Sequence, residues 1–221
     1  MAVTSASLTP ASPETQALLD ALQRADSALA LLQATQALAA CADPAIAPAL
    51  VEVLGFNNPG AAVAAVDGLI GLGEAAVPAL LQLDPQNYGA RAWAVRALAG
   101  IGDVRGLELL EDALGGDVAA SVRRAAAKGL GQLRLEGLDP VRRSQTQQRC
   151  LKALLAACGD GEWVVRYAVV VGLESLAQPL PGEALSRPEA CRSLQALAEL
   201  AQEAVPVVRL RAELALRRLA G

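Results

Sequence analysis

The stretch NYGARAWAVRALAGI, residues 87–101, decides how this sequence folds, because it recurs four more times along the chain. Its counterparts are NPGAAVAAVDGLIGL from residue 58, VAASVRRAAAKGLGQL from 118, EWVVRYAVVVGLESL from 162 and VPVVRLRAELALRRL from 205. Each copy places apolar residues at the 3.6-residue period of a helix. One leucine aligns them, at spacings of 29, 32, 43 and 43 residues: Leu69, Leu98, Leu130, Leu173 and Leu216. Self-similarity of this kind predicts a repeat protein.

A second apolar helix is predicted before each copy. These helices cover residues 44–54, 74–83, 104–114, roughly 144–158, and 188–202. Asp43 and Asn58 each cap a helix that starts with proline, and Gly73 and Gly102 stand where a helix should stop. A more divergent pair, residues 14–24 and 27–41, is expected to cap the stack. The sequence therefore predicts an all-α fold, an α-solenoid of about six antiparallel helix pairs.

The domain organisation follows from the repeat. Residues 1–12, rich in Ser, Thr and Pro, are predicted to be a flexible tail, and residues 13–221 a single solenoid domain. Two insertions, LEGLDPVRR at 135–143 and the proline-rich QPLPGEALSRP at 178–188, explain the two longer spacings.

Composition and charge exclude several classes of function. The net charge of −4 argues against nucleic acid as a partner, since phosphate binding needs clustered cations. No basic leader and no apolar run long enough to cross a bilayer is visible, so no membrane span and a cytoplasmic protein are expected. The chain has no histidine, and its four cysteines form no CxxC pair. Zinc sites and histidine-dependent catalysis are thereby excluded, and no metal is expected.

A column of arginines runs through the aligned copies: Arg91, Arg123, Arg166 and Arg209. Asp117 and Asp160 lie in the turns before two of them. The pattern resembles the Asp and Arg ladder of HEAT repeats, in which the turn and helix of neighbouring repeats are joined. The ladder is predicted to be structural, and these arginines are not candidate site residues.

One face of the recurring helices should point away from the core. In residues 87–101 the core positions are Ala90, Ala94, Ala97, Leu98 and Ile101. The opposite columns give the candidate binding residues, which are Asp67, Tyr88, Arg96, Arg124, Lys128, Trp163 and Tyr167. Trp93, whose column is otherwise alanine, is expected to be a half-buried packing residue. On these residues alone a protein-binding groove is favoured over a site for a flat, anionic small molecule.

Four motifs carry a family resemblance: NNPGAAVAAVDGLIGLGEAAVPAL at 57–80, NYGARAWAVRALAGIGD at 87–103, SVRRAAAKGLG at 121–131 and WVVRYAVVVGL at 163–173. The sequence resembles the heterodimeric E/F-type bilin lyases of cyanobacteria, which are HEAT-like proteins, and in length their smaller F-type (beta) subunit. NYGARAW and WVVRYA are its specific part. The likeness covers most of residues 14–177.

The resemblance implies a substrate, partners and residue roles. A linear tetrapyrrole, phycocyanobilin or a related bilin, would be attached to a phycobiliprotein cysteine, with the phycocyanin α subunit as the expected acceptor. A larger E-type subunit would be the partner, and no cofactor is implied. Tyr88, Trp163 and Tyr167 would contact the pyrrole rings. Arg96, Arg124 and Lys128 would meet propionates or the acceptor protein. Asp67 would accept from pyrrole N–H groups and is a tentative catalytic residue.

The implied reaction adds the acceptor thiol across the ring A ethylidene and gives a thioether. Such a lyase can work by orientation without a nucleophile of its own. The cysteines are predicted to act as small buried apolar residues, and this role is favoured over that of a transient bilin anchor. Relatives that isomerise the bilin carry a His-Cys pair, so attachment without isomerisation is expected here. The alternative is a non-catalytic HEAT adaptor or chaperone in phycobilisome assembly or turnover.

Overall fold

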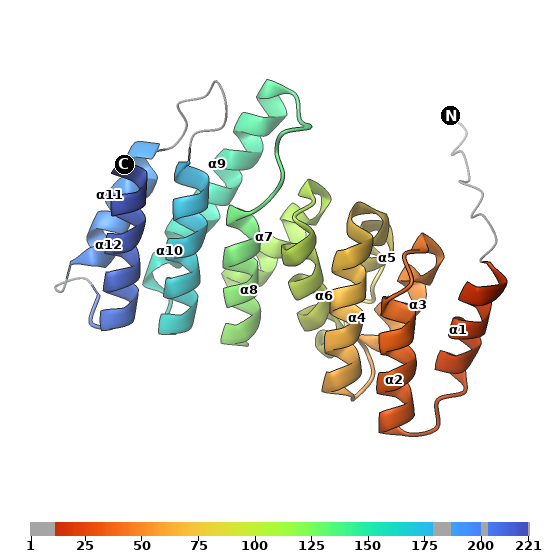
Figure 1. The fold of residues 1–221 in the computed structure, drawn as a ribbon. Helices are drawn as coiled ribbons and strands as arrows, with labels where there is room; N and C mark the ends of the chain where they lie inside the picture. The colour runs from red at the N-terminus through yellow and green to blue at the C-terminus, as the bar shows by residue number, and fades with distance from the viewer. Residues whose placement is uncertain (1–11, 179–186, 200–202, 221) are drawn as a thin grey trace. The chain divides into compact units, whose positions relative to one another are not determined.

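The computed structural model describes residues 12–178, 187–199 and 203–220, which form helices α1 to α12 (Figure 1). They make six consecutive pairs. The first, or A, helices of the pairs are α1 (Pro13–Gln23), α3 (Ala47–Val53), α5 (Val77–Leu81), α7 (Leu107–Gly116), α9 (Pro140–Ala156) and α11 (Arg187–Ala198). The second, or B, helices are α2 (Ala28–Ala39), α4 (Pro59–Leu72), α6 (Tyr88–Ile101), α8 (Ala120–Gly131), α10 (Trp163–Ala177) and α12 (Pro206–Ala220). The predicted α-solenoid of about six helix pairs is confirmed.

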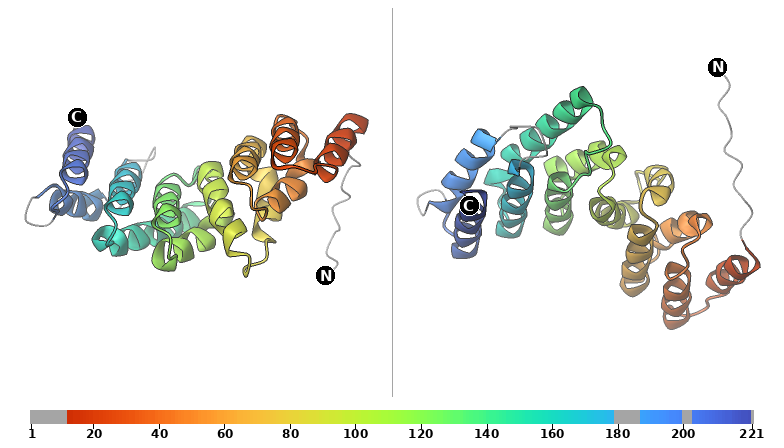
Figure 2. Two further views of the ribbon diagram at one scale, coloured as in Figure 1. Left: turned by 90° about the horizontal axis from the view of Figure 1, so that it is seen from below. Right: turned by 45° about the horizontal axis from the view of Figure 1, so that its top comes forward.

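The chain divides into two compact units, residues 1–97 and 98–221. In the first unit α2 packs against both α1 and α4, and α3 packs against α4. In the second, α8, α10 and α12 pack side by side as one layer, and α7, α9 and α11 form the layer behind them (Figure 2). Residues 1–11 of the predicted tail lie outside the described residues. Ser12 is already part of the fold, because its side chain accepts the Thr15 N–H at the start of α1.

Local signals place most helix ends. Asn58 caps α4 by accepting the Ala61 N–H, and Asp43 holds the start of the short turn Pro44–Ile46. Gly73 and Gly102 both have positive φ, 62° and 70°, the conformation that favours glycine after a helix. One boundary was predicted wrongly. The helix expected to begin near residue 144 begins at Pro140, because Asp139 caps it by accepting the Arg142 N–H.

By length and composition alone, Pro59–Leu81 is apolar enough to cross a membrane, with a mean hydropathy of 1.5, contrary to the expectation from sequence. In the structure this stretch is not one helix. Helix α4 ends at Leu72, the chain turns through Gly73 and the 3₁₀ turn Gly73–Ala76, and α5 begins the next pair. Val77 and Leu80 of α5 are fully buried in the unit. The stretch is therefore the end of one helix pair and the start of another.

Neighbouring B helices approach closely at small residues, and this sets their spacing. A Cβ at Gly68 of α4 would lie 2.7 Å from Ala39 Cβ of α2, and one at Gly129 of α8 would lie 2.6 Å from Ala99 Cβ. At Gly172 of α10 the obstacle is backbone, since the added atom would lie 2.7 Å from the Ala127 carbonyl oxygen. Because backbone cannot move aside cheaply, only glycine fits at this contact.

Gly172→Ala should therefore lower the free energy of unfolding by about 2 kcal/mol, because the new methyl group must push α8 and α10 apart. Urea unfolding followed by circular dichroism measures this. Gly71→Ala is the matched control, since its Cβ would meet nothing within 4 Å and helix propensity should add roughly 0.5 kcal/mol. Equal effects of the two substitutions would show that the close contact does not exist.

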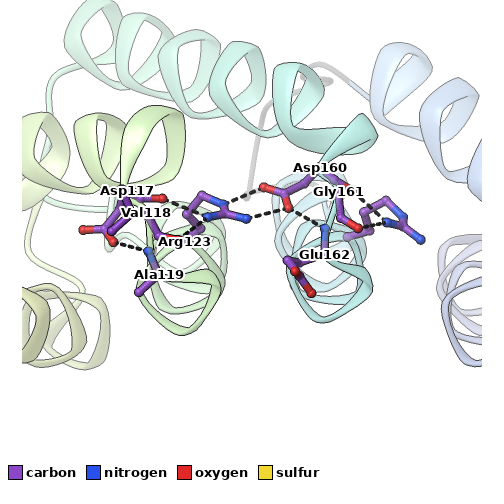
Figure 3. Close-up of polar contacts among 8 residues, drawn as sticks. Asp117, Val118, Ala119, Arg123, Asp160, Gly161 and Glu162 are labelled. Atoms are coloured by element: carbon purple, nitrogen blue, oxygen red, sulfur yellow. Dashed lines mark hydrogen bonds and ion pairs between the residues drawn. The ribbon is translucent and has the colours of Figure 1, made fainter.

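Two arginines of the column, Arg123 and Arg166, form the predicted ladder (Figure 3). Arg91 does not, since its buried Nε has no hydrogen-bond partner in the described part of the chain. Arg123 donates from Nε and Nη2 to Asp160, at 2.7 and 2.9 Å, and from Nη1 to the Asp117 carbonyl at 2.8 Å. Arg166 repeats the arrangement one pair later, with Glu203 as its carboxylate at 2.5 and 2.8 Å. Sequence reasoning missed Glu203, which stands where the preceding turns carry aspartate. Each rung thus joins one B helix to the turn of the following pair.

The ladder makes stability depend on pH. The Arg166 guanidinium beside Glu203, together with the Val205 N–H, holds the pKa of this buried carboxyl below its ordinary value of 4.5. A carboxyl whose pKa is lower in the folded state stabilises the fold above the unfolded-state pKa. That contribution is lost as the pH falls through the folded-state pKa.

Glu203→Gln should lower stability by about 3 kcal/mol near neutral pH, because Arg166 would keep its charge without a buried partner. The difference from the wild type should shrink as the pH falls below 4.5, since the wild-type carboxyl then loses its charge as well. Thermal melts across pH 3 to 7 measure it, with the exposed Glu199→Gln as control. A difference that is independent of pH would contradict the ion pair.

Candidate binding surface on the B helices

The outward face of the B helices is organised as the columns predict. The five core positions of α6, from Ala90 to Ile101, are buried, whereas Tyr88 is 48% exposed on the opposite side. Trp163 occupies the same column on α10 and is 45% exposed. We call this side of the B helices the B-helix face, defined by the seven predicted residues from Asp67 to Tyr167. Three of the seven belong to residues 1–97 and four to residues 98–221.

In the first unit, Asp67 lines a hollow of about 350 Å³ between α2 and α4. The hollow exists because small residues line it, among them Ala39, Gly60 and Gly68. Gln36 of α2 adds a second polar group beside Asp67. Gln36 was not among the predicted residues, because α2 belongs to the divergent first pair that was predicted to be only a cap.

Arg96 is held against an aromatic ring. Its guanidinium carbon lies 4.7 Å from the centre of the Trp93 ring, three residues earlier on α6, which is a cation–π contact. Trp93 is half-buried, as predicted. It nevertheless belongs to the candidate surface, because it fixes the cation that was expected to meet a ligand carboxylate. The i, i+3 spacing of Trp93 and Arg96 was the signal that could have revealed this contact.

In the second unit, the candidate residues lie on two neighbouring helices. Arg124 and Lys128 are exposed one turn apart on α8, and Trp163 and Tyr167 are one turn apart on α10. Helices α8 and α10 touch through backbone at Gly131 and Gly172, and Arg124 and Tyr167 hold the same position in their repeats, 43 residues apart. Within the described residues, neither Arg124 nor Lys128 forms an ion pair. The surface therefore offers flat apolar rings beside cations that remain available to an anion.

The cysteines lie away from this chemistry. Burial raises the pKa of the Cys150 thiol to about 12 and that of Cys158 to about 11. The Cys158 thiol also donates to the Leu154 carbonyl oxygen at 3.6 Å. All four cysteines are unpaired. High thiol pKa values make Cys150 and Cys158 poor nucleophiles near neutral pH, which fits a packing role.

Two further hollows lie between A helices, where sequence reasoning placed none. One of about 370 Å³ lies between the end of α3 and the segment after α5, and is lined by Glu52, Phe56 and Asp84 among others. The other, of about 520 Å³, lies between α7 and α9 and is lined mainly by glycine and alanine, with Glu111 at its edge. In the part of the chain that the structure describes, no group of three or more Cys, Asp or Glu side chains could hold a metal ion.

Comparison with known proteins decides the family. A family model of HEAT repeats matches residues 77–146. Phycocyanin alpha phycocyanobilin lyase CpcF of Synechocystis sp. PCC 6803 is 54% identical over 167 residues, which is 75% of this chain and 78% of that protein. The chain belongs to the family of phycocyanobilin lyase beta subunits. The resemblance seen in NYGARAW and WVVRYA is thereby confirmed.

Two more relatives support this membership. Bilin biosynthesis protein RpcF of Synechococcus sp. WH8020 is 49% identical over 214 residues, or 95% of this chain and 98% of that protein. A solved structure of the complex of CpcE and CpcF of phycocyanin lyase from Nostoc sp. PCC 7120 contains a chain 45% identical, with a TM-score of 0.70. The match covers 78% of this chain and 99% of the other. The lyase family thus shares this fold at high sequence identity.

Proposed function

We propose that this chain is the beta subunit of a lyase that attaches phycocyanobilin, or a related linear tetrapyrrole, to a cysteine of the phycocyanin α subunit. The bond formed is a thioether, and the bilin is not isomerised. A larger E-type subunit is the partner. The carrying observation is the 54% identity with a protein named as a phycocyanin alpha phycocyanobilin lyase. The likeness to a chain solved in a CpcE–CpcF complex supports the partner.

The B-helix face supplies what a bilin requires. Trp163 and Tyr167 offer ring faces for the conjugated pyrroles, and Arg124 and Lys128 on the neighbouring helix offer cations for the propionates. In the first unit, Tyr88 offers a further ring and Arg96, stacked on Trp93, a further cation. Asp67, in its hollow with Gln36, can accept from pyrrole N–H groups and steer protonation of the tetrapyrrole.

The chemistry asked of this chain is orientation. The acceptor cysteine adds its sulfur to the ring A ethylidene, and its proton ends on the tetrapyrrole, so no group of the lyase is consumed. Holding the two reactants in one geometry can by itself supply a large acceleration. The raised thiol pKa values of Cys150 and Cys158 support a lyase that forms no bilin adduct through them. Unpaired cysteines also support a reducing compartment, the cytoplasm.

Co-expression with a bilin source, the larger lyase subunit and apo-phycocyanin α subunit tests the function. The wild type should give an acceptor that keeps its bilin fluorescence in a denaturing gel. Replacing Trp163 and Tyr167 together by alanine should reduce that signal at least about tenfold, because two stacking faces are lost. Phe56→Ala is the control, an aromatic side chain of similar exposure away from the B-helix face.

One result would contradict the lyase function, and another would contradict the role of the B-helix face. If the acceptor gains no covalent colour that depends on this chain, the lyase function is wrong and an adaptor that binds phycobiliprotein takes its place. If colour is formed equally well by the Trp163 and Tyr167 double variant, the function stands and the assignment of the B-helix face is wrong.

A further inference from the structure

The last arginine of the ladder differs from its predecessors in one respect. Arg209 donates from Nη1 to the carbonyls of Glu203 and Ala204, at 2.7 and 2.9 Å. Arg123 and Arg166 each donate to the two equivalent carbonyls of their own turn. Each of them also donates from Nε and Nη2 to a carboxylate. Among the residues that the structure describes, no carboxylate forms an ion pair with Arg209. The guanidinium group of Arg209 is therefore held by the same backbone contacts as those of Arg123 and Arg166, but without a carboxylate.

Apolar side chains flank this fork. Val207 is 43% exposed and Leu210 is 60% exposed, and both lie within one turn of Arg209 on α12. Leu210 follows Tyr167 by 43 residues, the repeat spacing, so it continues the B-helix face from α10 onto α12. Sequence reasoning ended that face at Tyr167. The first two turns of α12 thus combine a carboxylate-binding geometry with an exposed apolar surface.

The rest of α12 carries charge where the preceding B helices carry buried apolar residues. Ala127 and Val170 are fully buried between B helices, and the next residue in that column is Glu213. A charged residue in this column is typical of the polar outer face of a solenoid. The occupant must therefore touch only the first two turns of α12.

We propose that Val207, Arg209 and Leu210 form a docking ledge for the acceptor protein, which presents there an aspartate or glutamate between apolar side chains. This inference rests on the proposed function for the identity of the acceptor. The ladder indicates that the group bound by Arg209 is a carboxylate, because Arg123 and Arg166 each bind a carboxylate in a bidentate manner. A ledge of three side chains favours a transient partner, since the interface of a stable complex buries about 1,200–2,000 Å² and involves many more residues. The acceptor must arrive and leave at every turnover, whereas the larger subunit stays.

The test measures binding of apo-phycocyanin α subunit, without bilin, to the lyase assembled from both subunits. Arg209→Ala should raise the Kd about tenfold through loss of the charged, bidentate pair. Arg209→Lys should recover only part of that loss, because an ammonium group has no fork. Leu210→Ser should weaken binding as well. Arg217→Ala is the matched control, an exposed arginine on the same helix outside the ledge.

Specificity comes from two parallel measurements on the same variants. The affinity for the larger subunit should stay at the wild-type value in every ledge variant, and the absorbance change on binding free bilin should stay at the wild-type value in Arg209→Ala. An unchanged Kd for the acceptor in Arg209→Ala and Leu210→Ser overturns the ledge, as does a loss of affinity for the larger subunit instead. If Arg209→Ala also lowers the melting temperature, the Kd values of Arg209→Lys and Leu210→Ser for the acceptor decide whether the ledge binds it.

Failure of the ledge and failure of the proposed function give different results. A wild-type complex that binds the acceptor but forms no thioether contradicts the lyase function and leaves the ledge standing. A complex that forms the thioether with the same KM for acceptor in every ledge variant contradicts the ledge alone.

Discussion

The close contact between neighbouring B helices is the constraint on which the rest of the structure depends. At Gly172 no side chain fits, because the carbonyl oxygen of Ala127 would lie only 2.7 Å from a Cβ. This contact fixes the distance between α8 and α10 and, with it, the distance between the cations of one helix and the aromatic rings of the other. Because the chain has few aromatic residues and many alanines, its core is built by close approach of helices at small side chains. A rigid spacing is also what a surface that works by orientation requires.

Adjacent residues on each B helix have separate tasks. Arg123, Arg166 and Arg209 point along the stack, where two of them tie their helix to the following turn. Their immediate neighbours Arg124, Tyr167 and Leu210 lie on the outward side, the first two on the B-helix face and Leu210 on the proposed ledge. A rotation of 100° per residue separates the two roles. The ladder thereby holds the helices in register while the exposed side chains change from cationic to aromatic to aliphatic along the second unit.

Much of this could be predicted from sequence, because the decisive signals are local. The leucine column, the proline and asparagine caps and the exposed columns depend on helical periodicity, and they placed the helix pairs and Tyr88 and Trp163 correctly. Features that depend on three-dimensional proximity were missed. Gln36 lines the same hollow as Asp67 from another helix, and no periodicity reports it. Glu203 follows Asp160 by 43 residues, the repeat spacing, but it was missed because it is a glutamate in a column of aspartates. Helix α9 begins at Pro140 because Asp139 caps it, and this local signal was missed because both residues lie in the predicted insertion.

The central claim is that this chain supplies oriented surface and no covalent group of its own. A variant in which Cys41, Cys150, Cys158 and Cys191 are all replaced by alanine or serine tests it most directly. Assembled with the larger subunit and given bilin and apo-phycocyanin α subunit, the variant should form the thioether at the wild-type rate once its folding has been verified. A folded variant that binds bilin but no longer transfers it would contradict the claim.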